Sequence, residues 1–454
     1  MNRTLACYFE MIDDFFGSIK HYLGKDEESH IDLGQKMASY PLISDLIIDA
    51  IDEIDIEINK FWQQNAKLVA DYTKNRSTLK CLYSGSITPY ILESFVKRSA
   101  LYIDTIILPD PLFNLAVLQK RFVSNKKYYL NKLITHVFNI WKLKDLILAD
   151  TDEKILIILP TSLQTIDPKE KKKLLRVASQ KFIEYINELF GHNLDKQSRV
   201  DDFLKTFSNT KDIYNAIKSP ALLPNEFREF KSFDAGMRDF ISTSEYTSLK
   251  DDTVGGNLGL YLNSQFIRVQ EHKFFCQKLI AGPIYDHELA WFFFNYEMGG
   301  LDMDAAIANA LQKEHFSWVS KVPIHALKIL REENELDYMR SVLRTGITDL
   351  KAKHDQDLST ICSQIEKNFT EAFQKQDSEL KQLREKVEKI TRKEIPITTG
   401  GFLAGFIPYV GNVVSLLSAG RDMKQHLQEK EITEEIIQDK ETNLINLLMK
   451  SYEN

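Results

Sequence analysis

The sequence predicts a mainly α-helical protein: a multi-helix body with a small β-sheet or hairpin, one long coiled-coil-like helix and a C-terminal hydrophobic helical hairpin. Three observations lead to this fold class. Apolar side chains recur at helical spacing over most of the chain. Runs that favour β-structure are confined to two short stretches, near residues 105–108 and 146–159. A proline-free, highly charged stretch over 333–394 then leads into residues 395–420, which carry no charge.

The composition is that of a folded, globular protein. The 454 residues are 43% hydrophobic and 27% charged, which is too apolar for a disordered chain and enough for two or three domains. The net charge of −7 argues against electrostatic binding to nucleic acid, so no nucleic-acid partner is expected.

Cysteine spacing and the N-terminal sequence bear on location and cofactors. Cys7, Cys81, Cys276 and Cys362 form no CxxC pair, so the sequence predicts no zinc motif, and we expect no metal and no cofactor. The first residues include acidic side chains where a secretion signal needs a continuous apolar core. We therefore expect a cytoplasmic protein that associates with the inner membrane conditionally, through its C-terminal region.

Residues 1–80 are predicted to be an N-terminal helical region. Apolar pairs such as Tyr8-Phe9 and Phe15-Phe16 recur at the spacing of one helical face. A charged loop near 25–29 follows, and residues 43–69 are typical of a long amphipathic helix with acidic side chains along one side.

Residues 81–332 are predicted to form the main helical body. Ser84-Gly85-Ser86 is a break, and Thr88-Pro89 is typical of the start of a helix that continues to about residue 103. The apolar residues within 105–108 indicate a short buried strand. Helical spacing resumes over 112–141, and 146–159 is typical of a β-hairpin, so we expect a small sheet of three strands.

The second part of this body is predicted to be helical throughout. Asp167-Pro168 is typical of a helix start, and Gly191 is placed to cap the same helix after Phe190. Helices are then expected to continue to about Arg331. The expected interruptions are Pro220, Pro224, 251–259, 282–283 and 299–300.

Residues 333–394 are predicted to form one long coiled-coil-like helix. Apolar side chains recur with a mixture of seven- and eleven-residue spacing, which predicts a nearly straight coil. A narrow apolar stripe on a charged helix needs a partner helix, from this chain or from another copy. The residues expected to mediate oligomerisation are Leu358, Ile361, Ile365, Phe369, Leu380, Leu383 and Val387.

The segment from Ile395 to Gly420 contains no charged residue, which is the usual signature of a membrane-spanning helix. Pro408 and its neighbouring glycines divide it into two arms that each reach about 13 Å, whereas a bilayer core is about 30 Å thick. A kinked span, a re-entrant hairpin and a helical hairpin buried in protein all fit this pattern. The residues expected to contact lipid or a partner are Gly401, Phe402, Gly405, Phe406, Ile407, Pro408, Gly411, Val413 and Leu416. Residues 421–454 are predicted to be an amphipathic tail.

Two pairs of aspartates flank the predicted strands: Asp104 with Asp110, and Asp150 with Asp152. Carboxylates at strand ends can bind a metal ion or act as acid and base. Aspartate is also a common turn residue, so a structural role is the preferred interpretation. An acidic active site near Asp104 and Asp110 is the alternative, and no other catalytic residue is predicted.

Other short motifs lack a residue that their chemistry would need. The sequence Val254–Gly259 is not a phosphate-loop pattern and is expected to be a plain loop, and His287 lacks the second histidine of a zinc-binding helix. Ser84–Ser86 does not fit a nucleophile elbow. The basic run 169–173 is expected to be a solvated helix face, and the aromatic run 291–294 to be core.

Two stretches, Tyr102–Pro111 and Val322–Leu327 followed by Leu336–Arg340, resemble uncharacterised, mostly helical bacterial proteins, and no activity is implied by this resemblance. The order of a long coiled helix and then an uncharged glycine-rich hairpin is similar to the stalk and hydrophobic head of α-helical pore-forming proteins. Those proteins usually return from the head through a second long helix, whereas here only residues 421–454 follow. This difference argues against a pore but not against membrane contact.

Three functions remain open from the sequence. The first is a non-enzymatic helical sensor, effector or adaptor whose C-terminal segment acts at a membrane, as in a toxin-like or phage-defence effector. The second is a soluble scaffold protein that self-associates through the long helix and buries the hairpin. The third is an enzyme with an acidic site near Asp104 and Asp110. The expected partners are membrane lipid and a protein partner or a second copy of the chain.

Overall fold

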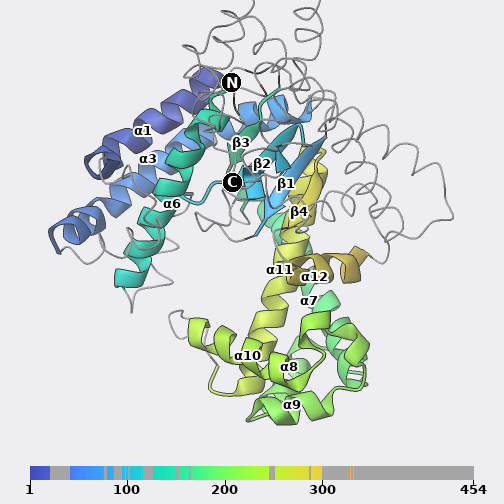
Figure 1. The fold of residues 1–454 in the computed structure, drawn as a ribbon. Helices are drawn as coiled ribbons and strands as arrows, with labels where there is room; N and C mark the ends of the chain where they lie inside the picture. The colour runs from blue at the N-terminus through green and yellow to red at the C-terminus, as the bar shows by residue number, and fades with distance from the viewer. Residues whose placement is uncertain are drawn as a thin grey trace, which may run out of the picture. The chain divides into compact units, whose positions relative to one another are not determined.

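The described part of the protein is mostly helical, with one small parallel β-sheet (Figure 1). The structure is a computed structural model. It describes residues 1–20, 41–75, 79–85, 95–97, 99–100, 103–113, 115, 126–149, 151, 153–162, 165–244, 251–285, 288–298, 328 and 331.

The chain divides into two compact units. The first contains Met1–Leu92, Ile107–Lys142 and Ile157–Asp302, and the second contains Glu93–Ile106, Leu143–Leu156 and Met303–Asn454. Most of the described residues belong to the first unit.

The sheet has the strand order β3-β2-β1-β4. Its strands are β1 (Lys80–Ser84), β2 (Thr105–Pro109), β3 (Leu156–Leu159) and β4 (Gly282–Tyr285). β1 and β4 are parallel. Between β2 and β3, Ile106 N–H donates to Ile155 O at 2.9 Å and Asp110 N–H donates to Leu159 O at 2.8 Å, and this constant offset is that of a parallel pair.

Every strand is short and almost wholly buried, as expected for a parallel sheet whose faces are covered by helices. Pro283 has no N–H, and it lies in β4, a terminal strand of the order, where a missing donor is tolerated.

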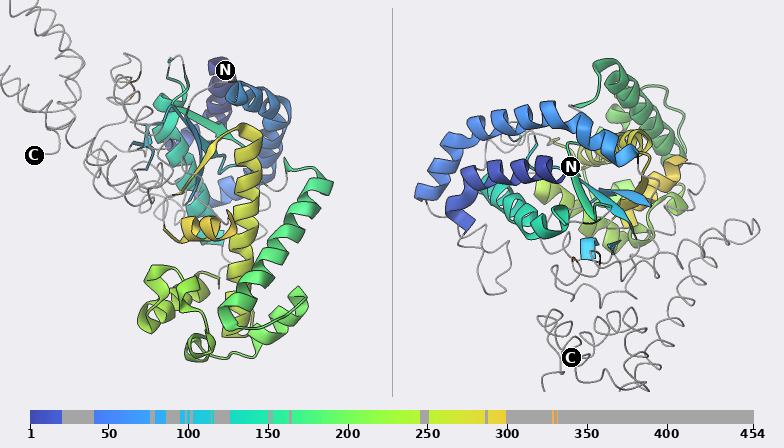
Figure 2. Two further views of the ribbon diagram at one scale, coloured as in Figure 1. Left: turned by 90° about the vertical axis from the view of Figure 1, so that its right-hand side faces the viewer. Right: turned by 90° about the horizontal axis from the view of Figure 1, so that it is seen from above.

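Three helices of the first unit lie side by side near the sheet (Figures 1 and 2). These are α1 (Asn2–Lys20), α3 (Pro41–Lys74) and α6 (Lys126–Ile147). Trp141 Nε1–H on α6 donates to the Asp13 carboxylate on α1 at 2.8 Å. Tyr8 on α1 and Trp62 on α3 are buried together, with ring centroids 5.4 Å apart, so aromatic packing holds α1 against α3.

Helix α7 (Pro168–Phe190) begins and ends at the residues that its sequence predicts. The Asp167 side chain accepts a hydrogen bond from Lys169 N–H, and Pro168 occupies the first turn, where its missing N–H has no cost. Gly191 ends the helix in the left-handed region at φ 68°, which glycine adopts without strain.

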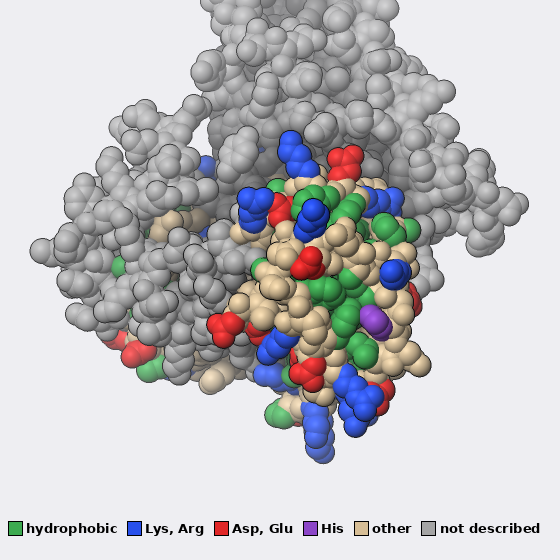
Figure 3. Space-filling model, turned by 90° about the horizontal axis from the view of Figure 1, so that it is seen from below, with side chains coloured by type: hydrophobic (Ala, Val, Ile, Leu, Met, Phe, Trp, Pro, Cys, Tyr) green, Lys and Arg blue, Asp and Glu red, His purple; other side chains and the backbone are tan. Residues whose placement is uncertain are grey.

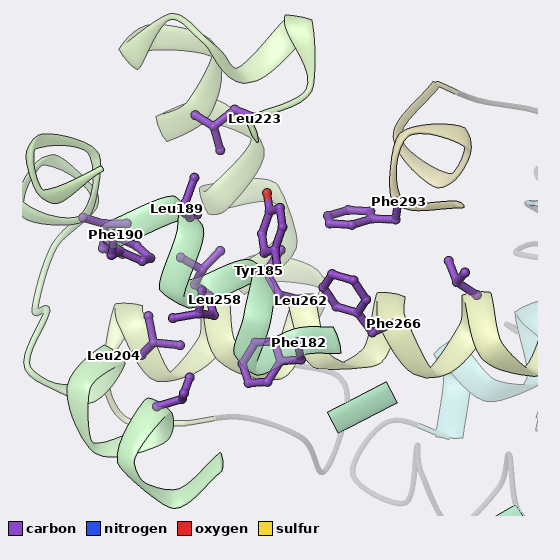
Figure 4. Packing of buried hydrophobic residues seen from close by; sticks show 14 of the residues in the cluster. Phe182, Tyr185, Leu189, Phe190, Leu204, Leu223, Leu258, Leu262, Phe266 and Phe293 are labelled. Atoms are coloured by element: carbon purple, nitrogen blue, oxygen red, sulfur yellow. The ribbon is translucent and has the colours of Figure 1, made fainter. Parts of the chain in front are cut away.

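The segment after α7 forms a helical lobe, which consists of α8 (Gln197–Lys205), α9 (Thr210–Ala216), the short 3₁₀ turns η2 (Pro220–Leu222) and η3 (Asn225–Phe227), and α10 (Phe230–Ser244). A core of aromatic and aliphatic side chains joins this lobe to α7, α11 and α12 (Figure 4). Phe182, Tyr185 and Phe266 are fully or almost fully buried at its centre. Burying a side chain of this size contributes about 1.5–3 kcal/mol, so this core holds the lobe on α11.

Helix α11 (Val254–Leu279) runs from the lobe to the sheet (Figures 1 and 2). Thr253 caps its first turn by accepting from Gly256 N–H at 3.0 Å. The residues predicted to be a plain loop, Val254–Gly259, are therefore the beginning of this helix. A Cβ on Gly255 would lie 1.9 Å from Leu204 O, so only glycine permits the close approach of α11 to α8.

The end of α11 leads directly into β4 through an unusual residue. Ile280 has φ 54°, the left-handed region that costs a β-branched residue about 1–2 kcal/mol, and its side chain is 67% exposed. Ala281 N–H then donates to Cys276 O at 3.0 Å. This bonding closes the helix and allows the chain to enter β4 at Gly282 and to continue into α12 (Glu288–Met298).

In the second unit, the buried guanidinium of Arg331 organises the approach to β2. It donates hydrogen bonds to Ala100 O at 2.8 Å, Ile103 O at 2.9 Å and Asp104 O at 2.7 Å. A planar group with several donors satisfies carbonyls at a chain turn that would otherwise be buried without partners.

Some of the predicted elements are confirmed and others are wrong. The strand near 105–108 and the helices over 43–69 and 167–190 are confirmed. The hairpin over 146–159 is wrong, because Leu146 and Ile147 belong to α6 and only β3 is a strand, in a parallel pair. The sheet has four strands instead of the expected three, because the strand expected at 146–149 is absent and β1 and β4 were not predicted.

The predicted long helix 333–394, the uncharged segment 395–420 and the tail 421–454 lie outside the described residues. Within the described ranges, no helix combines the length and the apolar character that crossing a bilayer requires.

Candidate functional site

The carboxyl ends of β1 and β4 form the candidate site. The two strands pair in parallel, with Ser84 opposite Tyr285. Both strands therefore end at the same level of the sheet, about 4.8 Å apart. The halves of all four strands nearest this edge, and the residues that follow them, belong to the first unit.

The strand order makes this edge special. From β1 the chain continues to β2 and β3 on one side, and it then returns to the other side of β1 to form β4. The order therefore reverses between β1 and β4. In open parallel sheets, ligands bind outside the carboxyl ends of the strands where the order reverses, because the two connections diverge there.

Two kinds of group lie at this edge. Small and polar residues end β1, and the first residues of a helix follow β4. Ser84 and Gly85 are half-buried and end β1. Helix α12 begins at Glu288, three residues after Tyr285. The first four N–H groups of a helix have no partner within the helix, and they carry a partial positive charge. The edge thus offers a serine hydroxyl, a glycine backbone and the positive end of a helix dipole.

His272 on α11 joins both strands just inside this edge. Its Nε2 lies 3.0 Å from Leu82 O of β1, and its Nδ1 lies 2.8 Å from the Tyr285 hydroxyl of β4. A carbonyl only accepts, so Nε2 carries the proton, and Nδ1 accepts from the tyrosine O–H. Burial lowers the pKa of His272 to about 4, so the ring is neutral at neutral pH and this arrangement is retained.

Tyr285 is in turn held in an aromatic cluster beneath the edge. Its ring meets Trp291 at a centroid distance of 6.0 Å and Phe294 at 5.5 Å. Trp291 and Phe294 stack at 5.7 Å. The aromatic run of α12 therefore packs against the end of β4, as the sequence predicts for core.

Asp110 ends β2 at the same edge of the sheet, but its carboxylate is turned inward. Tyr8 O–H donates to one oxygen at 2.7 Å and Trp62 Nε1–H donates to the other at 2.5 Å. Leu112 N–H also donates, at 2.9 Å. Burial raises the pKa of Asp110, although these three donors act in the opposite direction. This carboxyl links α1 and α3 to β2, and its hydrogen-bonding capacity is largely used by the protein.

Asp104 and Asp110 do not form one acidic site. Asp104 directly precedes β2 and Asp110 directly follows it, so the strand's length, about 17–20 Å, separates them. Asp104 is buried, and its main-chain carbonyl accepts from Arg331. Within the described residues, no group of three histidine, cysteine, aspartate or glutamate side chains is arranged to hold a metal ion.

The other motifs in the described residues have structural positions. Glycines 255 and 256 begin α11, and the basic run 169–173 begins α7 with mostly exposed lysines. Figure 3 shows the molecule from below, with Lys and Arg side chains interspersed with Asp and Glu on the described part of that face. Mixed charge of this kind does not make a phosphate-backbone binding surface. The residues predicted for membrane contact and oligomerisation lie beyond the described part of the chain.

The ends of β1 and β4 were missed by the sequence reasoning. The sequence analysis interprets Ser84–Ser86 as a break that does not fit a nucleophile elbow, and Gly282-Pro283 as a helix interruption. A usable signal was present, because Cys81-Leu82-Tyr83 is a short apolar run before a glycine, the pattern of a buried strand and its turn.

No family model matches the chain, and no curated protein or solved structure is similar to it. The site is therefore interpreted from its own geometry.

The burial of His272 predicts a pH dependence of stability. The folded pKa of about 4 lies below the ordinary value of 6.5, so the unfolded chain takes up this proton first as the pH falls. The contribution of neutral His272 to the free energy of unfolding is therefore complete above pH 6.5 and is lost progressively down to pH 4. The expected contribution is a loss of about 2 kcal/mol between pH 7 and pH 5.

Urea unfolding of wild type and His272→Gln at these two pH values measures this loss. Glutamine retains one donor and one acceptor but does not titrate, so the pH dependence should shrink by about 2 kcal/mol. His192→Gln, at an exposed position, is the matched control. An unchanged pH dependence in His272→Gln would contradict the proposed state of this ring.

Proposed function

We propose that the protein is a ligand-responsive effector whose parallel sheet binds a small phosphorylated molecule at the carboxyl ends of β1 and β4. The observation that carries this proposal is the strand order β3-β2-β1-β4, with Ser84 and Tyr285 in register across its point of reversal.

The chemistry of the edge favours a phosphate group. A serine hydroxyl and a glycine at a strand end allow a ligand to approach the backbone closely, and the positive end of the α12 dipole attracts negative charge. The sequence between β4 and α12, Asp286-His287-Glu288, is acidic, which favours a ligand that also offers hydroxyl donors. A sugar phosphate or a mononucleotide has both kinds of group.

A dinucleotide is a poorer fit. Dinucleotide-binding sheets follow the first strand with GxGxxG and use a free acidic side chain after the second strand for the ribose. Here the sequence after β1 is Gly85-Ser86-Ile87-Thr88, with a single glycine. Asp110, at the end of β2, is already bonded to Tyr8, Trp62 and Leu112.

Helix α11 provides a route from this edge to the helical lobe. His272, near one end, bonds to both strands of the site, while Gly255, at the other, packs against α8. A rigid helix fixed at both ends passes a small displacement from one to the other. This supports a sensor that responds to its ligand rather than a protein that only stores it.

Binding is tested by calorimetry with inorganic phosphate, ribose 5-phosphate, AMP, ATP and NAD. We expect at least one of the sugar phosphate and mononucleotides to bind and to raise the melting temperature, because a ligand that prefers the folded state stabilises it. NAD should bind more weakly than AMP. Gly85→Val places a side chain where the ligand meets the backbone and should weaken binding at least tenfold.

The matched control is Gly17→Ala, because a Cβ at Gly17 meets no atom within 4 Å and the helix tolerates alanine. It should bind as wild type does. Absence of binding by every compound, or equal affinity in Gly85→Val, would contradict the site.

We also propose that residues 395–420 act at a membrane and form the effector part of the protein. The supporting observation is that no charged residue lies between Glu394 and Arg421, whereas 27% of the whole chain is charged. The small residues Gly401 and Gly405 would allow close helix approach within lipid.

Liposome flotation of the full chain, a chain ending at Glu394 and Gly405→Leu tests this second proposal. Full-length protein should float with the vesicles and the truncated chain should not. If neither floats and the truncated chain aggregates, the segment is part of a buried core. A soluble scaffold that self-associates through residues 333–394 then becomes the better function.

A further inference from the structure

Glu297 lies in the last turn of α12 and is one of the few buried acidic residues among those described in the first unit. The residue is 9% exposed, and its side chain is 2% exposed. It faces α11, where Gln270 is also buried. A carboxyl group removed from water in this way needs partners for both of its oxygens.

Within the described part of the chain, only one of the two oxygens has partners. Gln270 Nε2–H donates to Oε1, and Lys273 Nζ lies 3.4 Å from the same oxygen. Oε2 is buried and has no hydrogen-bond partner among the described residues. Leaving a buried acceptor without a partner costs about 1–3 kcal/mol, and more if the group is charged.

Charged and titratable groups face Glu297 from each element packed against it. Lys273 comes from α11, and Lys181 from α7, where its ammonium pairs with Glu184 at 2.8 Å. Tyr285 faces it from β4. Glu188 of α7 accepts from the Tyr296 hydroxyl, and it lies near Lys181 as well.

The positive charges do not outweigh burial. Lys181 is shared with Glu184 and Glu188, and Lys273 is partly exposed, so water and competing carboxylates weaken both. Burial raises the pKa of Glu297 above its ordinary value, while Lys273 and Gln270 act in the opposite direction. The protonated side chain carries no charge, keeps the bond from Gln270 and fits the site best.

We propose that Glu297 is a proton-operated latch, which holds the last turn of α12 against α11 when it is protonated and releases that turn when it ionises. The direction of this pH dependence follows from the linkage between protonation and stability. A carboxyl with a raised folded pKa contributes its full stability below the unfolded value, and this stability is lost as the pH rises through the folded pKa. The last turn of α12 is therefore held against α11 at low pH and released at high pH.

The latch lies in the last turn of the helix that follows β4 after two residues. The latch needs no ligand at the sheet edge, so it is independent of the proposed function above.

Amide hydrogen exchange of the full-length protein at pH 5.5, 6.5, 7.5 and 8.5 tests the latch. After correction for the intrinsic pH dependence of exchange, protection of the last turn of α12 in wild type should fall about tenfold across this range. Glu297→Gln mimics the protonated side chain, so its protection should change by less than twofold. Amides in the middle of α7 serve as the internal reference.

Lys273→Met is a second variant that tests the latch even if Glu297→Gln does not fold. Removing this cation disfavours the carboxylate, so the loss of protection should move to higher pH. Constant protection in wild type overturns the proposal. A fall in Glu297→Gln as large as in wild type, or an unshifted midpoint in Lys273→Met, also overturns it.

Discussion

The bridge that His272 makes between β1 and β4 is the interaction on which the described structure depends. Parallel strands cannot be joined by a tight turn, and the chain leaves the sheet after β3 and returns only at β4. More than a hundred residues separate β3 from β4, and most of these residues belong to α7, the helical lobe and α11. At the end of this long connection, the buried, neutral ring of His272 bonds both to Leu82 O of β1 and to the Tyr285 hydroxyl of β4.

Close contacts at both ends of α11 stabilise this connection between β3 and β4. At the lobe, Gly255 lets the helix backbone approach Leu204 O, and Thr253 caps the first turn. At the sheet, Ile280 accepts a left-handed backbone that glycine would adopt more easily. An exposed, β-branched residue in this conformation marks the joint between helix and strand as a place where the fold stores strain.

Local signals were enough to predict helices such as α7 and the strand β2, but not β1 and β4. Asp167, Pro168 and Gly191 define α7 because each acts on its nearest neighbours in the chain. Strands β1 and β4 are four or five residues long, and their partners are distant in sequence. Gly282 and Pro283 weaken the β pattern of β4, and only its position at the sheet edge makes Pro283 acceptable.

The acidic site considered as an alternative near Asp104 and Asp110 is not formed. The two residues lie at opposite ends of the predicted strand, whose extended backbone separates their side chains. The run Cys81–Tyr83 could have indicated β1, but the sequence gives no signal that Ser84 and Gly85 lie beside Tyr285, because the strand order makes them adjacent. Glu297 gave no sequence signal either, since its burial depends on three elements that meet in space.

The central claim is that β1 and β4 are adjacent, parallel and in the stated register. Cys81 is buried, forms no disulfide within the described residues and lies opposite Gly282, and a Cβ at Gly282 would lie 3.8 Å from its Sγ. Neighbouring strands have a spacing compatible with a disulfide. The decisive measurement is disulfide mapping by mass spectrometry of Gly282→Cys after mild oxidation, with Ala281→Cys as control. The account predicts a Cys81 link in the first variant and none in the control. A link in neither variant, or a link to Cys276 instead, would contradict it.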